Sequence, residues 1–424
     1  MRRLKRILKQ LLPSRSISAY HFLLAEFAAL IYRYPSRHMF VVAVTGTKGK
    51  SSVTEMVNVI LEEAGYTTAV LNSIRIKIGP SSEPNTMRMS MPGRLYLQKF
   101  LSKARSAGCD AVVLEMTSEG ARQHRHRGIA LDGLIFTNLA PEHIESHGSL
   151  QAYADAKFQI GRALARSKKS NRTIVANADD AESARYLALP VEHRLGFSLS
   201  DAEPWKATSH GGSFTFHGVN VHVPLPGEFS LKNALAAATL TNSIGIQPDV
   251  IARALTHMTR IPGRAESIDE GQPFDVIVDY AHTPDSLKAL YSAYGAQRKI
   301  CILGATGGGR DSWKRPVMGG IADAKCDIVV ATNEDPYDEN PAAIIAALTG
   351  AMKRTPEIVM DRRAAIARGL SLAKPGDAVL ITGKGTDPTI QGPNGSSTPW
   401  SDATVAREEL RTLLRGTPSR IMSS

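Results

Sequence analysis

FVVAVTGTKGKSS at residues 40–52 is the stretch that decides the fold. Its first half is a β-branched apolar run that predicts a buried strand, and Ser51 to about Ala64 has the apolar spacing of a helix. The turn between them has G-x-x-G-K-S spacing, tighter than the usual G-x-x-x-x-G-K-[ST]. Backbone N–H groups of such a turn, beside a helix N-terminus, are suited to bind phosphate. We therefore predict a strand, loop and helix that bind ATP.

The loop supplies most of the predicted nucleotide contacts. Lys50 would neutralise phosphate charge, and the Ser51 hydroxyl is suited to ligate Mg²⁺. A glycine turn without a ligand is the alternative, but the flanking strand and helix argue against it. The predicted ATP-binding residues of the loop are Gly46, Thr47, Lys48, Gly49, Lys50, Ser51 and Ser52.

Further strand and helix patterns extend over the rest of the chain. Apolar runs separated by helical stretches, as expected for a mainly parallel α/β sheet, recur at 67–71, 110–116, 131–137 and 173–177. Residues 211–226 alternate as in a hairpin, and helices are expected at 231–245 and 248–258. After residue 264, helices alternate with strands predicted at 274–280, 299–304, 327–332 and 377–382. We predict an α/β protein with a P-loop-type central ATPase domain at 39–261 and a C-terminal doubly wound, Rossmann-like domain at 262–424.

The chain has the composition of a soluble globular protein and an excess of positive charge. It has 424 residues, 43% hydrophobic and 21% charged, and a net charge of +11, which favours polyanionic partners. The first fifteen residues, MRRLKRILKQLLPSR, hold six basic residues and no acidic one. Residues 1–38 are predicted to form a basic amphipathic helical arm, interrupted at Pro13 and ended near Pro35. Packing on the next domain and attachment to an anionic membrane or a partner both remain open.

Cysteine spacing and hydropathy indicate the compartment. Cys109, Cys301 and Cys326 lie far apart without a C-x-x-C pair, so the sequence suggests neither a disulfide framework nor a zinc site. The longest apolar stretch near the start, about residues 21–34, contains Glu26 and is shorter than the ~20 residues of a spanning helix. No cleavable signal is evident. We predict a cytoplasmic protein.

An ordered set of other motifs accompanies the phosphate loop. The blocks are EMTSEGARQHR (115–125), TNLAPEHIESHGS (137–149), YADAK (153–157), PGEFSLKNALAAA (226–238), PGRAE (262–266), DYAHTPDSL (279–287), GGGRDSWKRPVMG (307–319), NEDP (333–336) and GKG (383–385). In order and spacing, residues 41–390 resemble the Mur ligase family, and within it the muramoyl-tripeptide synthetases. The resemblance implies an ATP-dependent, ADP-forming ligase of peptidoglycan synthesis. Such an enzyme activates a carboxylate of a UDP-N-acetylmuramoyl-peptide as an acyl phosphate and joins it to an amino acid. We expect these two substrates as partners, no nucleic acid, and a monomer.

The resemblance also implies roles for residues outside the loop. Glu115 and His143 match residues that hold Mg²⁺, to which Ser51 would add its hydroxyl. Lys157 matches a lysine that CO₂ converts to a carbamate, an anionic ligand near the metal. Without the resemblance, a lysine on an amphipathic helix is an ordinary solvated residue, so its role rests on the family alone.

Three more positions match residues that bind the nucleotide. Asn233 and Arg264 match residues that contact ATP, and Asp279 matches the acid that binds the ribose. An arginine near the γ-phosphate stabilises charge during phosphoryl transfer. Together these residues would place ATP between the two domains. The predicted catalytic residues are Lys50, Glu115, His143, Lys157 and Arg264.

The substrate residues are also assigned by resemblance. Positions that contact the muramoyl peptide are Ser90, Thr117, Ser118, Gln123 and Arg125. Positions that bind the incoming amino acid are Arg310, Asn333, Glu334, Asp335 and Lys384.

The sequence departs from the family in three places. Only about forty residues precede the phosphate loop, so we expect the usual N-terminal domain that binds the UDP to be absent. The family's D-N-P-R box, whose arginine binds diaminopimelate, reads EDPY with Tyr337 in place of the arginine, which disfavours that amino acid. GKG is followed by Thr386 and Asp387 instead of the usual G-K-G-H-E.

Two alternatives follow. Folylpolyglutamate synthases share the core and also lack that N-terminal domain, but they typically have D-G-A-H-N-P where this chain has DYAHTPD. A non-catalytic nucleotide-binding subunit would be expected to lose Glu115, His143 or Lys157, and all three are present.

Overall fold

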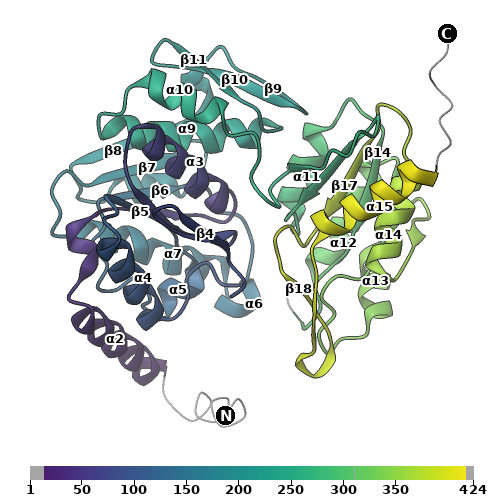
Figure 1. Cartoon of the computed structure of the whole chain (residues 1–424). Helices are drawn as coiled ribbons and strands as arrows, with labels where there is room; N and C mark the ends of the chain where they lie inside the picture. The colour runs from purple at the N-terminus through teal and green to yellow at the C-terminus, as the bar shows by residue number, and fades with distance from the viewer. Residues whose placement is uncertain (1–13, 310, 417–424) are drawn as a thin grey trace.

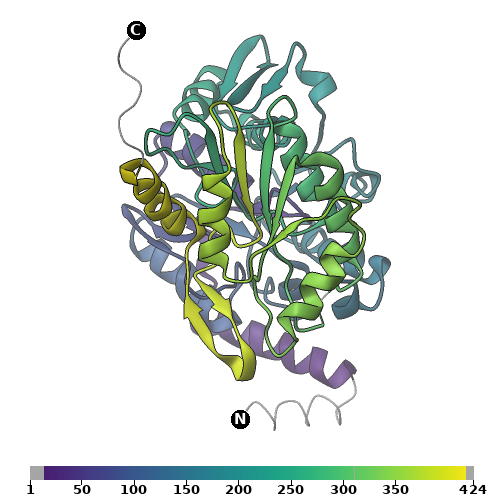
Figure 2. The ribbon, with the colours of Figure 1, turned by 90° about the vertical axis from the view of Figure 1, so that its right-hand side faces the viewer.

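Two α/β units make up this computed structural model, which describes residues 14–309 and 311–416 (Figure 1). The first unit is built on an eight-stranded sheet and the second on a six-stranded sheet. Figure 2, in which the second unit faces the viewer, shows its helices in front of and behind its strands. The predicted α/β class is confirmed.

The first sheet has the order β4-β3-β2-β5-β1-β6-β7-β8. Its strands are β1 (Phe40–Thr45), β2 (Thr68–Leu71), β3 (Arg75–Ile78), β4 (Ser81–Pro84), β5 (Ala111–Glu115), β6 (Gly133–Phe136), β7 (Thr173–Asn177) and β8 (His193–Phe197). Only the pairs β2–β3 and β3–β4 are antiparallel. Since β1 is central and parallel to both neighbours, the phosphate loop leaves from the carboxyl edge of the sheet, where ligands of α/β proteins bind.

Helices bury both faces of β1. The helices of this unit are α3 (Lys50–Glu63), α4 (Arg94–Ser106), α5 (Ser118–Arg122), α6 (Ile144–His147), α7 (Leu150–Ala165), α8 (Ser183–Leu187), α9 (Glu228–Ser243) and α10 (Pro248–Thr256). Val42 and Val44 join the core formed with α3 and α9, whereas Val41 and Ala43 join the core formed with α4 and α7. A strand covered on both faces needs apolar residues at every position, which explains the run FVVAVT.

The predicted hairpin belongs to a small antiparallel sheet. It consists of β10 (Gly211–Phe216) and β11 (Val219–Val223), with β9 (Lys206–Thr208) at its edge and the short helix η2 (Leu199–Ala202) before it. Phe214 and Val221 are fully buried in the core that contains α9 and α10.

The second unit is doubly wound, as predicted. Its sheet has the order β12-β13-β17-β14-β15-β16, and only β12 is antiparallel to its neighbour. Ile300 and Ile302 face α14 and α15, while Cys301 and Leu303 face α11 and α12. The strands are β12 (Glu266–Ser267), β13 (Asp275–Asp279), β14 (Lys299–Leu303), β15 (Ile328–Ala331), β16 (Glu357–Ile358) and β17 (Ala378–Thr382). The helices are α11 (Pro284–Ala293), α12 (Lys314–Lys325), α13 (Pro341–Thr349), α14 (Arg362–Ser371) and α15 (Asp402–Gly416). A hairpin of β18 (Thr389–Gln391) and β19 (Ser397–Pro399), with η3 (Pro393–Gly395) in its turn, precedes α15.

The expectation that the cysteines form no disulfide is wrong for one pair. Cys301 on β14 and Cys326 at the end of α12 are bonded, whereas Cys109 is free and buried. A strand and the helix that returns along it bring residues 25 positions apart into contact, and spacing in the sequence does not reveal this.

The N-terminal segment forms one long described helix. α2 (Ser14–Ile31) is followed by the short helix η1 (Pro35–His38), and the predicted helix before Pro13 lies outside the described residues. In Figures 1 and 2, α2 lies at the periphery of the first unit. Within the described chain, no helix is long and apolar enough to cross a membrane.

Candidate active site

The phosphate loop joins the carboxyl end of β1 to α3. Gly46 and Gly49 have φ values of 144° and 82°, a region that favours glycine. A Cβ on Gly46 would lie 2.0 Å from Thr137 Oγ1, and one on Gly49 would lie 2.4 Å from Asn233 Oδ1. Other residues are disfavoured at both positions, because the backbone has a positive φ there and a Cβ would clash with neighbouring side chains.

Hydrogen bonds fix the loop to the segment after β6. Thr47 N donates to Asn138 O, and Lys48 N donates to Asn138 Oδ1, both at 2.8 Å. Lys50 Nζ donates to Thr47 O at 2.9 Å. Desolvation, partly offset by Glu115 and Glu142, lowers the pKa of Lys50.

Glu115, at the end of β5, is the centre of an oxygen-rich cluster. Its Oε2 accepts from Ser51 Oγ at 2.8 Å and from Ser73 N at 3.0 Å, and its Oε1 accepts from Ser90 Oγ at 2.7 Å. Burial raises the pKa of Glu115, but Lys50 and the serine hydrogen bonds lower it below its usual value overall. A buried carboxylate surrounded by hydroxyls results.

This cluster fits Mg²⁺. The ion takes hard oxygen ligands and is commonly bound by one or two carboxylates, with phosphates and water completing its shell. Glu115 and Ser51 are such donors, and Lys50 is close enough to Glu115 to lower its pKa. No group of three His, Cys, Asp or Glu residues suited to a metal occurs among the described residues. The protein by itself therefore offers a partial shell.

Lys157, on α7, is buried without a carboxylate partner. Its Nζ donates to Gly46 O at 2.6 Å and lies 4.5 Å from the centre of the Tyr153 ring, and the side chain belongs to none of the ion pairs between described residues. Desolvation, followed by the charge of Lys50, holds the pKa of Lys157 well below its usual value. The position disfavours an ammonium ion and would favour an anion beside Lys50 and Lys48.

His143 lies in the loop before α6 with φ of 57°. Its backbone N–H donates to Asp311 Oδ2 of the second unit at 3.1 Å, and its side chain lines the same cavity as Glu115. Burial lowers the pKa of the ring, so it is neutral at pH 7 and can ligate a metal.

A second bridge between the units involves Glu142 and His282, neither of which was predicted as a site residue. Glu142 Oε1 lies 3.0 Å from Lys48 Nζ and 3.0 Å from His282 Nε2. Burial raises the pKa of Glu142, but Lys48 and His282 hold it well below its usual value. Burial and Lys48 lower the pKa of His282 to about 4. The EHIES and DYAHTP blocks contain both residues, but only the fold brings them together.

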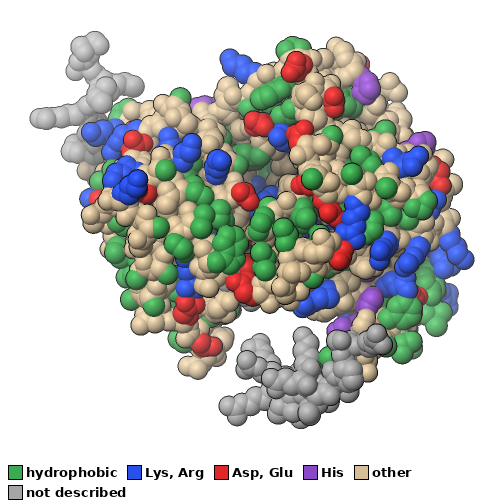
Figure 3. All heavy atoms as spheres, turned by 180° about the vertical axis from the view of Figure 1, so that it is seen from behind, with side chains coloured by type: hydrophobic (Ala, Val, Ile, Leu, Met, Phe, Trp, Pro, Cys, Tyr) green, Lys and Arg blue, Asp and Glu red, His purple; other side chains and the backbone are tan. Residues whose placement is uncertain are grey.

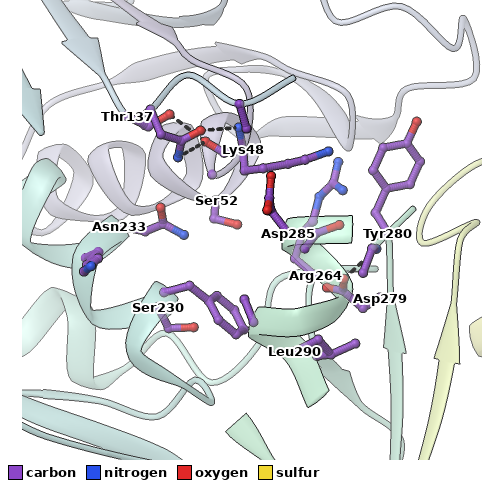
Figure 4. A pocket seen from close by; sticks show the side chains of 18 of the residues that line it. Lys48, Ser52, Thr137, Ser230, Asn233, Arg264, Asp279, Tyr280, Asp285 and Leu290 are labelled. Carbon is purple, nitrogen blue, oxygen red and sulfur yellow. Dashed lines mark hydrogen bonds between the residues drawn. The ribbon is translucent and has the colours of Figure 1, made fainter. Parts of the chain in front are cut away.

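A cavity of about 490 Å³ opens between the two units beside the loop (Figure 4). Lys48, Ser52, Asn233 and other residues of the first unit form one wall. Arg264, Asp279, Asp285 and Leu290 form the opposite one. Leu225, Phe229, Ile261 and Leu290 make part of the lining apolar. The volume and the mixed lining suit a purine nucleoside.

The three predicted nucleotide residues outside the loop all line this cavity. Arg264 Nη2 donates to Ser51 Oγ at 3.2 Å and to Ser73 Oγ at 2.9 Å, so it reaches across to the phosphate loop. Asp279 accepts from Ala265 N and Ala281 N, both at 2.6 Å. Burial raises the pKa of its carboxyl group.

A smaller cavity, about 220 Å³, adjoins the first and shares Lys48, Gly49 and Arg264 with it. It also contains Glu115 and His143, so the oxygen-rich cluster around Glu115 lies at this end. Its other wall comes from the second unit, including Thr386 and Asp387. A nucleotide in the large cavity would thus direct its phosphates toward the small one.

The predicted donor-substrate residues fall into two groups. Ser90 and Thr117 line the small cavity. Ser118 is buried in the first turn of α5, and Gln123 and Arg125 lie at the other end of that helix. Arg125 Nη2 donates to Gln123 Oε1 at 2.8 Å, and Gln123 Nε2 donates to Glu119 Oε1 at 2.6 Å, so these residues form a polar group that does not line the small cavity.

The predicted amino-acid residues lie in the second unit at the ends of β15 and β17. Lys384 Nζ is 2.9 and 2.8 Å from the two Asp335 oxygens, and both side chains are buried. Glu334 Oε1 accepts from Thr306 Oγ1 at 2.8 Å, while its buried Oε2 has no partner. Arg88 of the first unit lies 3.6 Å from Asp335. Asn333 precedes this group, and Arg310 lies outside the described residues.

Family models match most of the chain. The model described as "Mur ligase middle domain" matches residues 44–241, and "Mur ligase, glutamate ligase domain" matches residues 263–385.

Two relatives share 35% identity with the chain. One is the UDP-N-acetylmuramoyl-L-alanyl-D-glutamate–2,6-diaminopimelate ligase of Syntrophomonas wolfei, with 92% of this chain and 81% of the relative covered. The other is the UDP-N-acetylmuramyl-tripeptide synthetase of Roseiflexus sp., with 92% and 82% covered.

Solved structures have the same fold. A diaminopimelate ligase of the same name as the first relative is 26% identical with a TM-score of 0.60, covering 89% of this chain and 79% of its own. The folylpolyglutamate synthase of Mycobacterium tuberculosis is 17% identical with a TM-score of 0.65, and 98% of each chain is covered. At that identity only the fold is informative. Identity over most of both chains, together with both family models, shows that the chain belongs to the Mur ligase family.

Proposed function

We propose that this protein is an ATP-dependent, ADP-forming ligase that adds an amino acid to a UDP-N-acetylmuramoyl-peptide in peptidoglycan precursor synthesis. The observation that carries the proposal is the site between the units, where Glu115, Ser51 and Arg264 meet beside a nucleoside-sized cavity. The names of relatives that are 35% identical supply the reaction class. In this assignment residues 39–261 bind ATP, and residues 262–424 bind the amino acid.

In the proposed reaction the donor carboxylate attacks the γ-phosphorus of ATP, which releases ADP and forms an acyl phosphate. The amine of the amino acid then attacks the acyl carbon, loses a proton and displaces phosphate, which leaves an amide. Mg²⁺, when bound, would offset the negative charge of the phosphates during transfer of the γ-phosphoryl group. Lys50 and Arg264 would stabilise the charge that develops on the phosphoryl group, and Glu115 and His143 would hold the metal.

We propose further that Lys157 carries a carbamate. Its amine is buried, its pKa is held low and its cationic neighbours would stabilise an anion. A neutral amine can attack CO₂, and the carbamic acid that forms then loses a proton to become the carbamate. The resulting oxygens would complete the metal shell that Glu115 begins.

We propose that the incoming amino acid is one other than diaminopimelate. Tyr337 stands where the family arginine would bind the second carboxylate of diaminopimelate, and a tyrosine has no positive charge to offer that carboxylate.

The test is amino-acid-dependent phosphate release from ATP with Mg²⁺ and bicarbonate. A UDP-linked muramoyl dipeptide is supplied in one reaction and tetrahydrofolate with glutamate in another. Stimulation by the muramoyl donor alone supports the proposal. Stimulation by folate alone would assign the chain to folylpolyglutamate synthesis, and no release with either would remove both activities.

Lys157 is tested separately. Lys157→Ala should lower kcat by about 100-fold or more, with partial rescue by a small carboxylate, whereas Lys168→Ala on the exposed surface should be unaffected. With ¹³C-bicarbonate, wild type should show a carbamate resonance that Lys157→Ala lacks. Full activity of Lys157→Ala without rescue would contradict the carbamate.

A further inference from the structure

α2 exposes a stripe of large apolar side chains. Tyr20, Leu23, Phe27, Leu30 and Ile31 are between 51% and 67% exposed. Their spacing of three, four, three and one places them on one side of the helix. Figure 3 shows hydrophobic side chains gathered over this part of the surface, beside Lys, Arg and His side chains. Scattered apolar residues are usual on a surface, but a contiguous group of this kind marks an interaction site.

The opposite side of α2 fixes the helix to the first unit. Ala25, Ala28 and Ala29 are at most 1% exposed, and α2 packs against α4. Ser18 Oγ lies 2.8 Å from His124 Nε2, and the Arg127 guanidinium lies 4.4 Å from the centre of the Phe22 ring. Since small residues and these polar contacts hold the helix in place, its stripe of large residues is left on the outside.

The sequence on either side of α2 is basic. The fifteen residues up to Arg15 contain six basic residues and no acidic one. Beyond the other end of α2, Arg33 and Arg37 are exposed. Glu26, the one acidic residue of α2, lies 3.8 Å from Arg127. A large apolar face between basic segments is complementary to an anionic lipid surface, into which such helices insert their apolar side.

We propose that the apolar stripe of α2, with the exposed Arg33 and Arg37 beyond its C-terminal end, docks the protein peripherally on an anionic phospholipid membrane. The helix would lie in the plane of the headgroups with Leu23 and Phe27 directed into the lipid. α2 contacts His124 and Arg127, which lie on either side of Arg125, a predicted donor-binding residue. Docking would therefore hold the donor side of the active site at the membrane surface. The inference does not depend on which donor is used.

The test is cosedimentation of the full chain with phospholipid vesicles. Wild type should bind vesicles of phosphatidylcholine with phosphatidylglycerol, bind phosphatidylcholine alone weakly, and dissociate at high salt. Leu23→Glu/Phe27→Glu should reduce the bound fraction by about tenfold or more, because it removes apolar area and adds repelled charge. The matched control is Ile358→Glu/Met360→Glu, which changes exposed apolar residues of the second unit and should bind as wild type does.

Three results would overturn the docking. The first is wild type that does not bind anionic vesicles, and the second is a stripe variant that binds them equally well. The third is wild type that is dimeric without lipid while the stripe variant is monomeric and keeps its vesicle binding, because the stripe would then bind a second copy. Amino-acid-dependent phosphate release without lipid should be the same in wild type and the stripe variant, so this test and that of the proposed function fail independently.

Discussion

The buried side chain of His126 should make the stability of the protein depend on pH. The side chain is 4% exposed, and its Nδ1 is buried without a hydrogen-bond partner. Desolvation, followed by the nearby positive groups His124, Arg127 and Arg166, lowers its pKa from 6.5 to about 3. In the folded protein the ring is therefore neutral in mildly acidic solution, whereas in the unfolded chain it binds a proton.

This difference in proton binding makes the free energy of unfolding depend on pH. Between pH 6.5 and pH 3 the unfolded state binds more protons at this residue, so acidification favours unfolding. The free energy of unfolding should fall by about 1.4 kcal/mol per pH unit, and so by about 2 kcal/mol at pH 5 relative to neutral solution. The stability that comes from keeping His126 neutral is fully present above pH 6.5 and is lost progressively below it.

The perturbation is His126→Gln, which cannot take up the proton. Urea unfolding is measured at about pH 7.5 and about pH 5 for wild type, for His126→Gln and for the exposed control His257→Gln. The loss of stability on acidification should be smaller by about 2 kcal/mol in His126→Gln than in the other two proteins. Equal losses in all three would refute the reasoning, as would an NMR titration in which His126 takes up its proton near pH 6.5.

A buried ion pair and the bridge between the units can be tested in the same way. Asp402→Ala should lower the free energy of unfolding by about 3–5 kcal/mol, because it leaves Arg362 buried and unpaired. In urea unfolding, the exposed control Glu408→Ala should cost less than about 1 kcal/mol, and an equally small loss in Asp402→Ala would contradict the prediction. Glu142→Gln should lower kcat/KM of phosphate release by about 10–100-fold, because it weakens a charge-assisted contact with His282 across the cleft; unchanged kinetics would show that this contact does not support the active arrangement.

Some features of the molecule are encoded locally and could be predicted from the sequence. FVVAVT forms β1 because every position of a doubly covered strand is buried, and GTKGKSS forms the loop because Gly46 and Gly49 adopt positive φ. The hairpin at 211–223 and the helices from α9 to α15 follow from alternation and periodicity in the same way. Strands with weak patterns were not predicted, among them the antiparallel β3, the edge strand β8 and the two-residue β12.

Local sequence determined the strongly patterned strands and helices and the chemistry of the phosphate loop, since both depend on neighbours along the chain. Only the tertiary structure decided which residues far apart along the chain meet. Glu142 meets His282 140 positions away, and Arg264 reaches Ser51 213 positions away. The cysteine pair and the exposed stripe of α2 likewise depend on what packs beside them. A motif specifies which groups are available, but contact and exposure arise when distant segments are folded against one another.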